Sequence, residues 1–291
     1  MADTSLRSPP ESFDPEVVRQ IDARLDRIEA EHDVRVLLAV EWIGRASAFP
    51  RAYSDYYCSF IYTHPPRATF SLAHPCNDID TPLTPMLSVG GWELRKALDQ
   101  LLRGNPVVVE WLASPVVYRG DPAFRDAFFA LAQELADKGV MMSRYHYWAA
   151  YQYALRTPGC DTFSVKEFLR VLRPLLTWSW LATHEERLAP VGVERLMAGL
   201  DLAPDLSAAI HELIEREKAV EQMGQGTVAG SLLAFVEDTL KRATEATMRR
   251  SAAAAGTRRR LFASPGMARP DASAIARADD FYRHWLHHDG A

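Results

Sequence analysis

The sequence has little cysteine, little excess charge and no long hydrophobic run. Its 291 residues include three cysteines, Cys58, Cys76 and Cys160. An odd number at such wide spacing argues against a disulfide framework and favours a reducing compartment. The formal net charge of −5 and the pI near 6.0 remove any global electrostatic case for nucleic-acid binding. Because no apolar run reaches membrane-spanning length and the first residues are polar, we expect a cytoplasmic protein without membrane contact.

The chain is long enough for one large domain or two modest ones. Composition and hydrophobic periodicity divide it into five parts. Residues 1–13 read as a polar arm, 14–120 as an α/β (α+β) domain with a small mixed sheet, and 121–250 as an all-helical domain. Residues 251–272 are rich in Ala, Arg, Gly and Pro and read as a linker, and 273–291 as a last helix.

Two β-rich runs stand near the start of the first domain, Val34–Trp42 and Tyr57–Tyr62. The segment between them holds small, basic and acidic residues: Gly44, Arg45, Ser47, Ser54 and Asp55. Loop amides of this kind can face an anion, and a carboxylate at the start of a strand can hold a cation. The layout therefore predicts a site for a phosphate and a metal ion.

The neighbouring segments have their own signals. Asp14 and Pro15 predict a helix that runs to about Glu31. Pro65–Thr84 reads as a loop and Leu83–Val89 as a strand. Gly90 and Gly91 are expected to end that strand before a helix that begins at Trp92 and carries Arg95 and Lys96. These two cations are candidate phosphate ligands or solvated residues of an amphipathic helix.

The second domain is helical in pattern throughout. Helices are expected from Asp121, over Met141–Leu155, and after a capping box at Ser164–Glu167. The last of these carries Lys166, Arg170 and Arg173 at i, i+4 and i+7. Such a basic face either contacts a triphosphate or an RNA end, or is simply solvated.

Several segments match one family closely. The family reads near A-x-E-S-G-S-R-A-W-G-F and then S-D-Y-D-V-R-F-I-Y, and later D-L-S-G-W-D-L-R-K-A-L. Matching residues in the first two motifs are Ala39, Glu41, Arg45, Ala46, Ala48, Phe49, Ser54, Asp55, Tyr56, Phe60, Ile61 and Tyr62. The chain thus resembles the predicted nucleotidyltransferases of the DNA polymerase beta superfamily, in particular the RNA-repair-associated, YcgL-like branch.

The resemblance implies Mg²⁺-dependent transfer of a nucleotidyl group from a nucleoside triphosphate. That chemistry uses two cations held by converging carboxylates. Asp55 is the one expected metal-binding carboxylate in place. Tyr57 occupies the position of the second carboxylate and Ser88 that of the third. The nucleotide or a related phosphate ester is expected in a cleft between the two domains.

The phosphate loop departs from the family as well. Ile43 and Gly44 replace its Gly-Ser pair, and a β-branched isoleucine does not comfortably adopt a positive φ. Gly44 takes the place of the family's glycine in the phosphate loop if the loop register shifts by one residue. Further acids near the site are Glu41, Asp78, Asp80 and Glu93.

Three functions remain open at this point. The first is a divergent nucleotidyltransferase-fold protein that binds a nucleoside triphosphate and has weak or altered transfer activity. The second is a catalytically dead binding or regulatory protein, with RNA or a protein as partner. The third is another enzyme that uses the same cleft for acid–base work on a small molecule, with Glu41, Asp55, Tyr57 and Ser88 as its catalytic groups.

Overall fold

The computed structural model describes residues 6–47, 55–69, 72, 76–84, 86–155, 162–219, 225–255 and 270–287. These residues divide into two units. The first contains the chain up to Ala136 together with the last helix, and the second begins at Asp137. A mixed sheet with helices on it, followed by a mainly helical unit, confirms the predicted α/β class.

The first unit is built on a five-stranded sheet in the order β3-β4-β2-β1-β5. The strands are β1 (Arg35–Glu41), β2 (Tyr56–Thr63), β3 (Asp78–Asp80), β4 (Leu87–Glu93) and β5 (Val117–Gly120). β2 and β4 are parallel and the other pairs are antiparallel. The central strands β1 and β2 are buried along most of both faces, as expected for strands covered on both sides.

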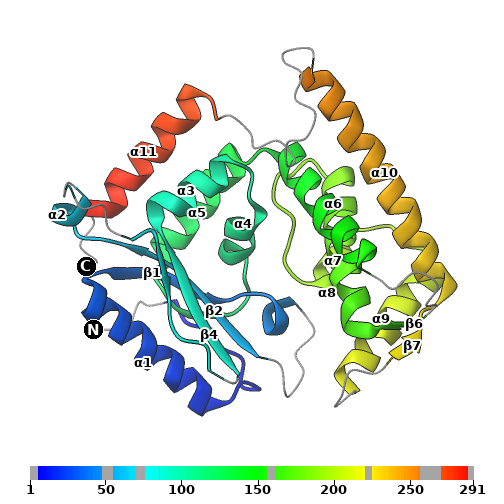
Figure 1. Ribbon diagram of the computed structural model, residues 1–291, viewed down its shortest axis with the longest axis horizontal. Coiled ribbons are helices and arrows are strands. Elements are labelled where there is room, and N and C mark those ends of the chain that lie inside the picture. The colour runs from blue at the N-terminus through cyan, green and yellow to red at the C-terminus, as the bar shows by residue number, and fades with distance from the viewer. Residues whose placement is uncertain are drawn as a thin grey trace. The chain divides into compact units, whose positions relative to one another are not determined.

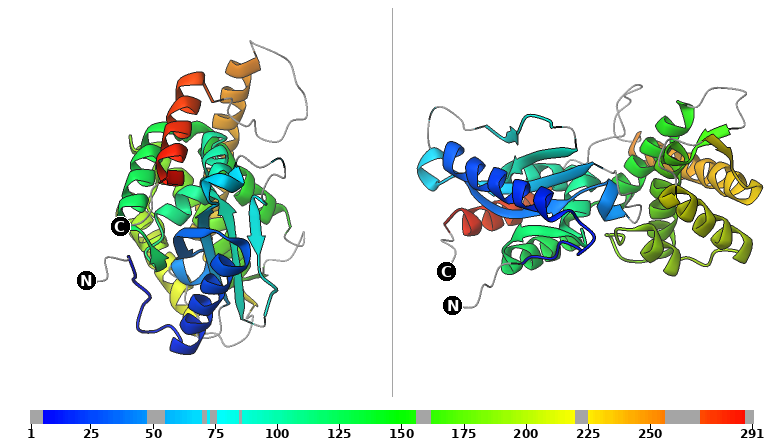
Figure 2. Two further views of the ribbon diagram at one scale, coloured as in Figure 1. Left: turned by 90° about the vertical axis from the view of Figure 1, so that its left-hand side faces the viewer. Right: turned by 90° about the horizontal axis from the view of Figure 1, so that it is seen from below.

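Helices cover both faces of this sheet (Figures 1 and 2). Helix α1 (Pro15–His32) buries Val18, Ile21, Leu25 and Ile28, which recur at helical spacing, against one face. The other face carries α3 (Leu94–Leu102), α4 (Pro106–Leu112) and α5 (Pro122–Leu135). Helix α11 (Ala272–His287) lies against α3 and α5.

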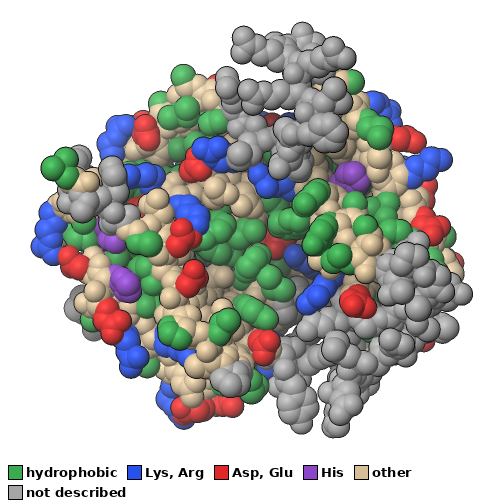
Figure 3. Space-filling view, in the orientation of Figure 1, with side chains coloured by type: hydrophobic (Ala, Val, Ile, Leu, Met, Phe, Trp, Pro, Cys, Tyr) green, Lys and Arg blue, Asp and Glu red, His purple; other side chains and the backbone are tan. Residues whose placement is uncertain are grey.

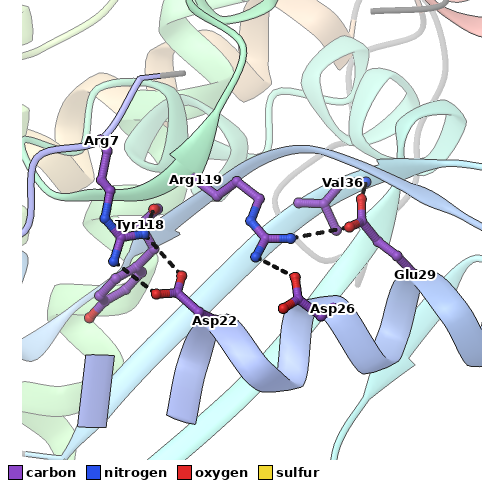
Figure 4. A network of polar contacts seen from close by, with 7 residues as sticks. All are labelled: Arg7, Asp22, Asp26, Glu29, Val36, Tyr118 and Arg119. Carbon is purple, nitrogen blue, oxygen red and sulfur yellow. Dashed lines mark hydrogen bonds and ion pairs between the residues drawn. The ribbon is translucent and has the colours of Figure 1, made fainter. Parts of the chain in front are cut away.

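The segment before α1 is bonded to the sheet edge rather than loose. The Leu6 and Ser8 amides donate to carbonyls of β5. Arg7 makes a two-pronged ion pair with Asp22 on α1, at 3.0 and 2.8 Å. Figure 4 shows Arg119 of β5 reaching the same helix at Asp26 and Glu29. The predicted polar arm therefore includes a segment that joins α1 to β5.

The second unit contains α6 (Lys138–Ala154), α7 (Val165–Thr183), α8 (Val193–Ala198), α9 (Pro204–Ala219) and α10 (Gly230–Ala255). Its core comes from all five helices and is rich in Leu and Trp. Pro174 lies inside α7, as predicted. The pair of short strands β6 (Thr162–Ser164) and β7 (Gln225–Thr227) is an addition to the expected all-helical pattern.

The division between the units differs from the expected boundary at residue 121. Helix α5 belongs to the first unit because Phe124 and Phe128 pack against Phe281 and Trp285 of α11. Helix α10 continues to Ala255, past the predicted start of the linker at 251. Residues 256–269 of that linker lie outside the described part.

Two local expectations were wrong. Gly90 and Gly91 do not end a strand, since β4 continues through both to Glu93. Gly91 is required there because a Cβ would lie 2.4 Å from the Phe60 ring. The predicted loop at 65–84 contains a short helix, α2 (Pro66–Thr69), and the edge strand β3, which pairs with β4. Within the described residues no helix is long and apolar enough to cross a membrane.

Candidate functional site

The site begins with the parallel pairing of β2 and β4. Tyr57 lies opposite Ser88 in this register, so both side chains project from the same face of the sheet. Their neighbours Tyr56 and Leu87 project from the other face, into the core under α1. The two positions at which the family has carboxylates are thus adjacent in space, on the face that carries α3 to α5.

Asp55 lies one residue before β2 and is exposed. The Tyr57 hydroxyl donates to its Oδ2 at 3.2 Å. Ser88 is half-buried on the neighbouring strand. The structure therefore brings Asp55, Tyr57 and Ser88 together.

Ser59 and Asp80 extend this group. Ser59 pairs with Gly90 on β4, and Asp80 of β3 pairs with Gly90 from the other side. A Cβ at Gly90 would lie 2.3 Å from Asp80 Oδ1, so the carboxylate lies over the glycine. We call the set Asp55, Tyr57, Ser59, Asp80 and Ser88 the hydroxyl face.

Tryptophans border the hydroxyl face. The rings of Trp42 and Trp92 each contact the ring of Trp111 on α4, with centroids 6.1 and 4.6 Å apart. The Trp42 indole N–H donates to Glu110 at 3.0 Å, which holds the ring in place. Figure 3 shows hydrophobic side chains gathered over the region of α4. A polar face with an aromatic border suits a ligand that has both polar and planar parts.

Glu41 lies on the opposite face and is fully buried. It pairs with Cys58 at the end of β1 and accepts a hydrogen bond from the Tyr118 hydroxyl at 2.6 Å. Both of its carboxylate oxygens accept from the Tyr57 amide. Burial raises the pKa of Glu41 to about 7, against the lowering effect of these hydrogen bonds and of Arg45. The prediction that Glu41 joins Asp55, Tyr57 and Ser88 in acid–base work is therefore wrong, because its side chain projects from the wrong face of the sheet.

The turn after β1 is η1 (Gly44–Ser47), a short 3₁₀ helix. Ile43, at the position of the family's glycine, has a φ of 63°. This is a left-handed conformation, which a β-branched isoleucine does not adopt comfortably. Arg45 is buried, and its guanidinium lies 3.9 Å from the centroid of the Tyr56 ring. The side chain of Ser47 and the whole of Ser54 lie outside the described part.

Arg95 and Lys96, the predicted phosphate ligands of α3, have partners within the first unit. Arg95 donates to the Tyr282 hydroxyl of α11 and its guanidinium lies over that ring. Lys96 forms an ion pair with Asp78 and lies 4.7 Å from the centroid of the Trp92 ring. Their structural contacts link α3 to α11 and to β3.

The basic residues of α7 belong to the second unit. Arg170 is exposed and Arg173 is half-buried, whereas the side chain of Lys166 lies outside the described part. The helix is the one that the capping-box pattern predicted. These residues stay predicted ligands, and the hydroxyl face is formed without them.

The donors of the hydroxyl face do not match a two-cation site. Of the three family positions only Asp55 offers a carboxylate, and phenol and serine hydroxyls are poor ligands for Mg²⁺. Among the described residues no three His, Cys, Asp or Glu side chains are grouped closely enough to hold a metal ion. The chemistry that this face offers on its own is hydrogen bonding and proton exchange among hydroxyls and carboxylates.

Ser59 and Trp111 were not predicted as site residues from the sequence, and Asp80 was predicted only as a further acid near the site. Ser59 follows Tyr57 at the two-residue spacing of a strand. Because alternate residues of a strand share a face, this spacing could have predicted Ser59 as a site residue. Asp80 was placed in a loop, since a three-residue edge strand has almost no sequence pattern of its own. Trp111 reaches the site only because α4 packs beside the sheet.

Comparisons with known proteins show what this chain is similar to. A family described as the RNA repair pathway DNA polymerase beta family matches residues 17–262. The uncharacterized protein YcgL of Bacillus subtilis (strain 168) is 30% identical over 228 residues, which cover 78% of this chain and 87% of that protein. The crystal structure of a nucleotidyltransferase-like protein from Exiguobacterium sibiricum 255-15 aligns over 92% of each chain, with 11% identity and a TM-score of 0.37. On the family match and the YcgL similarity, the chain belongs to the RNA repair pathway DNA polymerase beta family.

Proposed function

We propose that this protein binds a nucleoside triphosphate or a related phosphate ester at the hydroxyl face, with weak or altered nucleotidyl transfer. The observation that carries the proposal is the pairing of Tyr57 with Ser88 beside Asp55. These are the family's catalytic positions, held next to one another on one face of the sheet. Two of the three acids that the family motif has at these positions are replaced here by hydroxyls.

This set of side chains supports binding more than transfer. Transfer through two cations needs carboxylates that converge on the same metal pair. Hydroxyls at positions 57 and 88 bind a ligand by hydrogen bonds, and of the three family positions only Asp55 carries a charge. The expected outcome is a site with measurable affinity for a nucleotide and slow turnover.

Calorimetric titration with each nucleoside triphosphate, first with Mg²⁺ and then with EDTA, tests this proposal. We expect saturable binding that persists in EDTA, and at least a tenfold loss of affinity in Ser88→Trp, whose side chain would cover the face. Asp99→Asn on the exposed surface of α3 is the control. Binding that requires Mg²⁺ and is lost in Asp55→Ala would show that a cation at Asp55 holds the ligand. Absence of binding in both conditions would contradict the proposal.

A second candidate is acid–base chemistry on a small molecule. It is favoured by the hydrogen bond from the Tyr57 hydroxyl to Asp55, since a carboxylate next to a phenol can exchange a proton with it. A turnover rate that does not depend on added metal and that is lost in Tyr57→Phe would favour this candidate. The family description names RNA repair, so a short RNA with a terminal phosphate belongs among the ligands titrated.

A further inference from the structure

Gly90 lies in the centre of the hydroxyl face, and its lack of a side chain leaves room there for a neighbouring group. Ser59 lies beside it on β2 and Asp80 beside it on β3. Because glycine has no Cβ, the carboxylate of Asp80 lies over β4, where any other residue would meet Oδ1 at 2.3 Å. The glycine therefore places a negative charge above the central part of the sheet.

Ser59 offers a hydroxyl toward the same place. Its side chain is only 7% exposed, and no described residue forms a hydrogen bond with its Oγ. A ligand that reaches this place can exchange a hydrogen bond with the Ser59 hydroxyl, which both donates and accepts.

Ser88 completes the set two residues before Gly90 on the same strand face. A carboxylate and two serine hydroxyls accept hydrogen bonds, and the carboxylate can accept from two neighbouring hydroxyls at once. A phosphate group at this place would be repelled by Asp80. The chemistry therefore selects a ligand group that carries adjacent hydroxyls and no negative charge.

We propose that Asp80, Ser59 and Ser88 bind the vicinal diol of a ribose, so that the protein prefers ribonucleotides to deoxyribonucleotides. This inference rests on the proposed nucleotide binding and names the part of the ligand that the centre of the face recognises. Trp92 lies two residues beyond Gly90, so an apolar surface adjoins the polar one. The negative charge of Asp80 directs the phosphates of the ligand away from β3.

Calorimetric titration with each ribonucleoside triphosphate and with its 2′-deoxy and 3′-deoxy forms tests the inference. We expect the ribonucleotide to bind wild-type protein about tenfold more tightly than either deoxy form, the difference of one charge-assisted hydrogen bond. Asp80→Asn should remove most of this preference and leave the affinity for the deoxy forms nearly unchanged. Ser59→Ala should reduce the preference in the same direction.

Asp78→Asn is the matched control, because Asp78 lies on the same short strand and pairs with Lys96 instead. It should keep the ribose preference. Equal binding of ribo and deoxy forms by wild-type protein would overturn the inference while the proposed function stands. A preference that survives in Asp80→Asn, or that Asp78→Asn also removes, would overturn it as well. If no nucleotide binds, the proposed function and this inference both fall.

Discussion

Glu41 shows how one residue can match a family motif and have a role other than the expected one. Its carboxylate contacts the Tyr57 amide and the Tyr118 hydroxyl beneath the sheet. It thereby ties the end of β1 to the start of β2, where Asp55 and Tyr57 lie. Glu41 is thus a positioning residue for the hydroxyl face.

The buried carboxyl of Glu41 should make stability depend on pH. Its pKa of about 7 lies above the value near 4.5 of an unfolded glutamate, so the folded state holds this proton more tightly. The stabilisation is complete below about pH 4.5 and is lost as pH rises through 7, with a total of about 3 kcal/mol. In Glu41→Gln this loss should be absent, so the variant should gain stability relative to wild type between pH 5 and 8.

Urea unfolding at several pH values measures this effect. Glu31→Gln, an exposed residue near the end of α1, is the control and should follow the wild-type curve. A constant difference between Glu41→Gln and wild type across this pH range would show that Glu41 is ionised in the folded state throughout.

At the scale of elements, the turn from β1 into η1 has a left-handed residue at the position where the family motif has a glycine. A glycine adopts a φ of 63° without strain, whereas Ile43 has a branched Cβ that opposes it. The Ala46 amide donates to the Ile43 carbonyl at 2.9 Å, so the turn is held by its own hydrogen bond. The turn conformation is therefore set by the strand and by η1, and Ile43 is strained within it.

Ile43→Gly should stabilise the protein by about 1 kcal/mol, in contrast to most isoleucine-to-glycine changes. Relief of the left-handed strain exceeds the extra entropy of an unfolded glycine, and the partly exposed side chain contributes little packing. Chemical denaturation measures the difference. Ile43→Val keeps the branched Cβ and should be near neutral. A Gly variant less stable than wild type would mean that the side chain packs more strongly than its exposure indicates.

At the scale of the whole molecule, each of the two units has a core of its own among the described residues. One lies between α1 and the sheet, with the aromatic contacts of α5 and α11 on the other side. The second is formed by α6 to α10. The last helix belongs to the first unit, although the whole second unit separates the two in sequence.

Two core substitutions should therefore affect different unfolding transitions. Trp285→Ala removes a buried ring that contacts Phe124, and Phe168→Ala removes a buried ring from the core of the second unit. Each should cost about 3–5 kcal/mol in its own unit. Differential scanning calorimetry should show one transition lowered by the first change and a second lowered by the other. Ile275→Ala, partly exposed on α11, is the control, and a single transition lowered by both changes would contradict the prediction.

Local sequence signals were sufficient for many elements. Asp14 and Pro15 start α1, and four apolar residues at helical spacing place its buried face. The β-branched and aromatic runs form β1 and β2, and the motif around Tyr57 indicated the family. Signals of this kind lie within a few residues of one another, so they can be read along the chain.

The tertiary structure alone decided which of these residues meet. Ser59 and Asp80 meet across Gly90 because β4 lies between their strands, and no local pattern encodes that order. Glu41 is hidden because the register of β1 against β2 places it opposite Cys58. Long-range strand pairing sets both outcomes, and a shift of one residue would exchange the faces of a strand. The sequence by itself therefore determined the family and the chemical groups available, and the folded sheet determined which of them share a face.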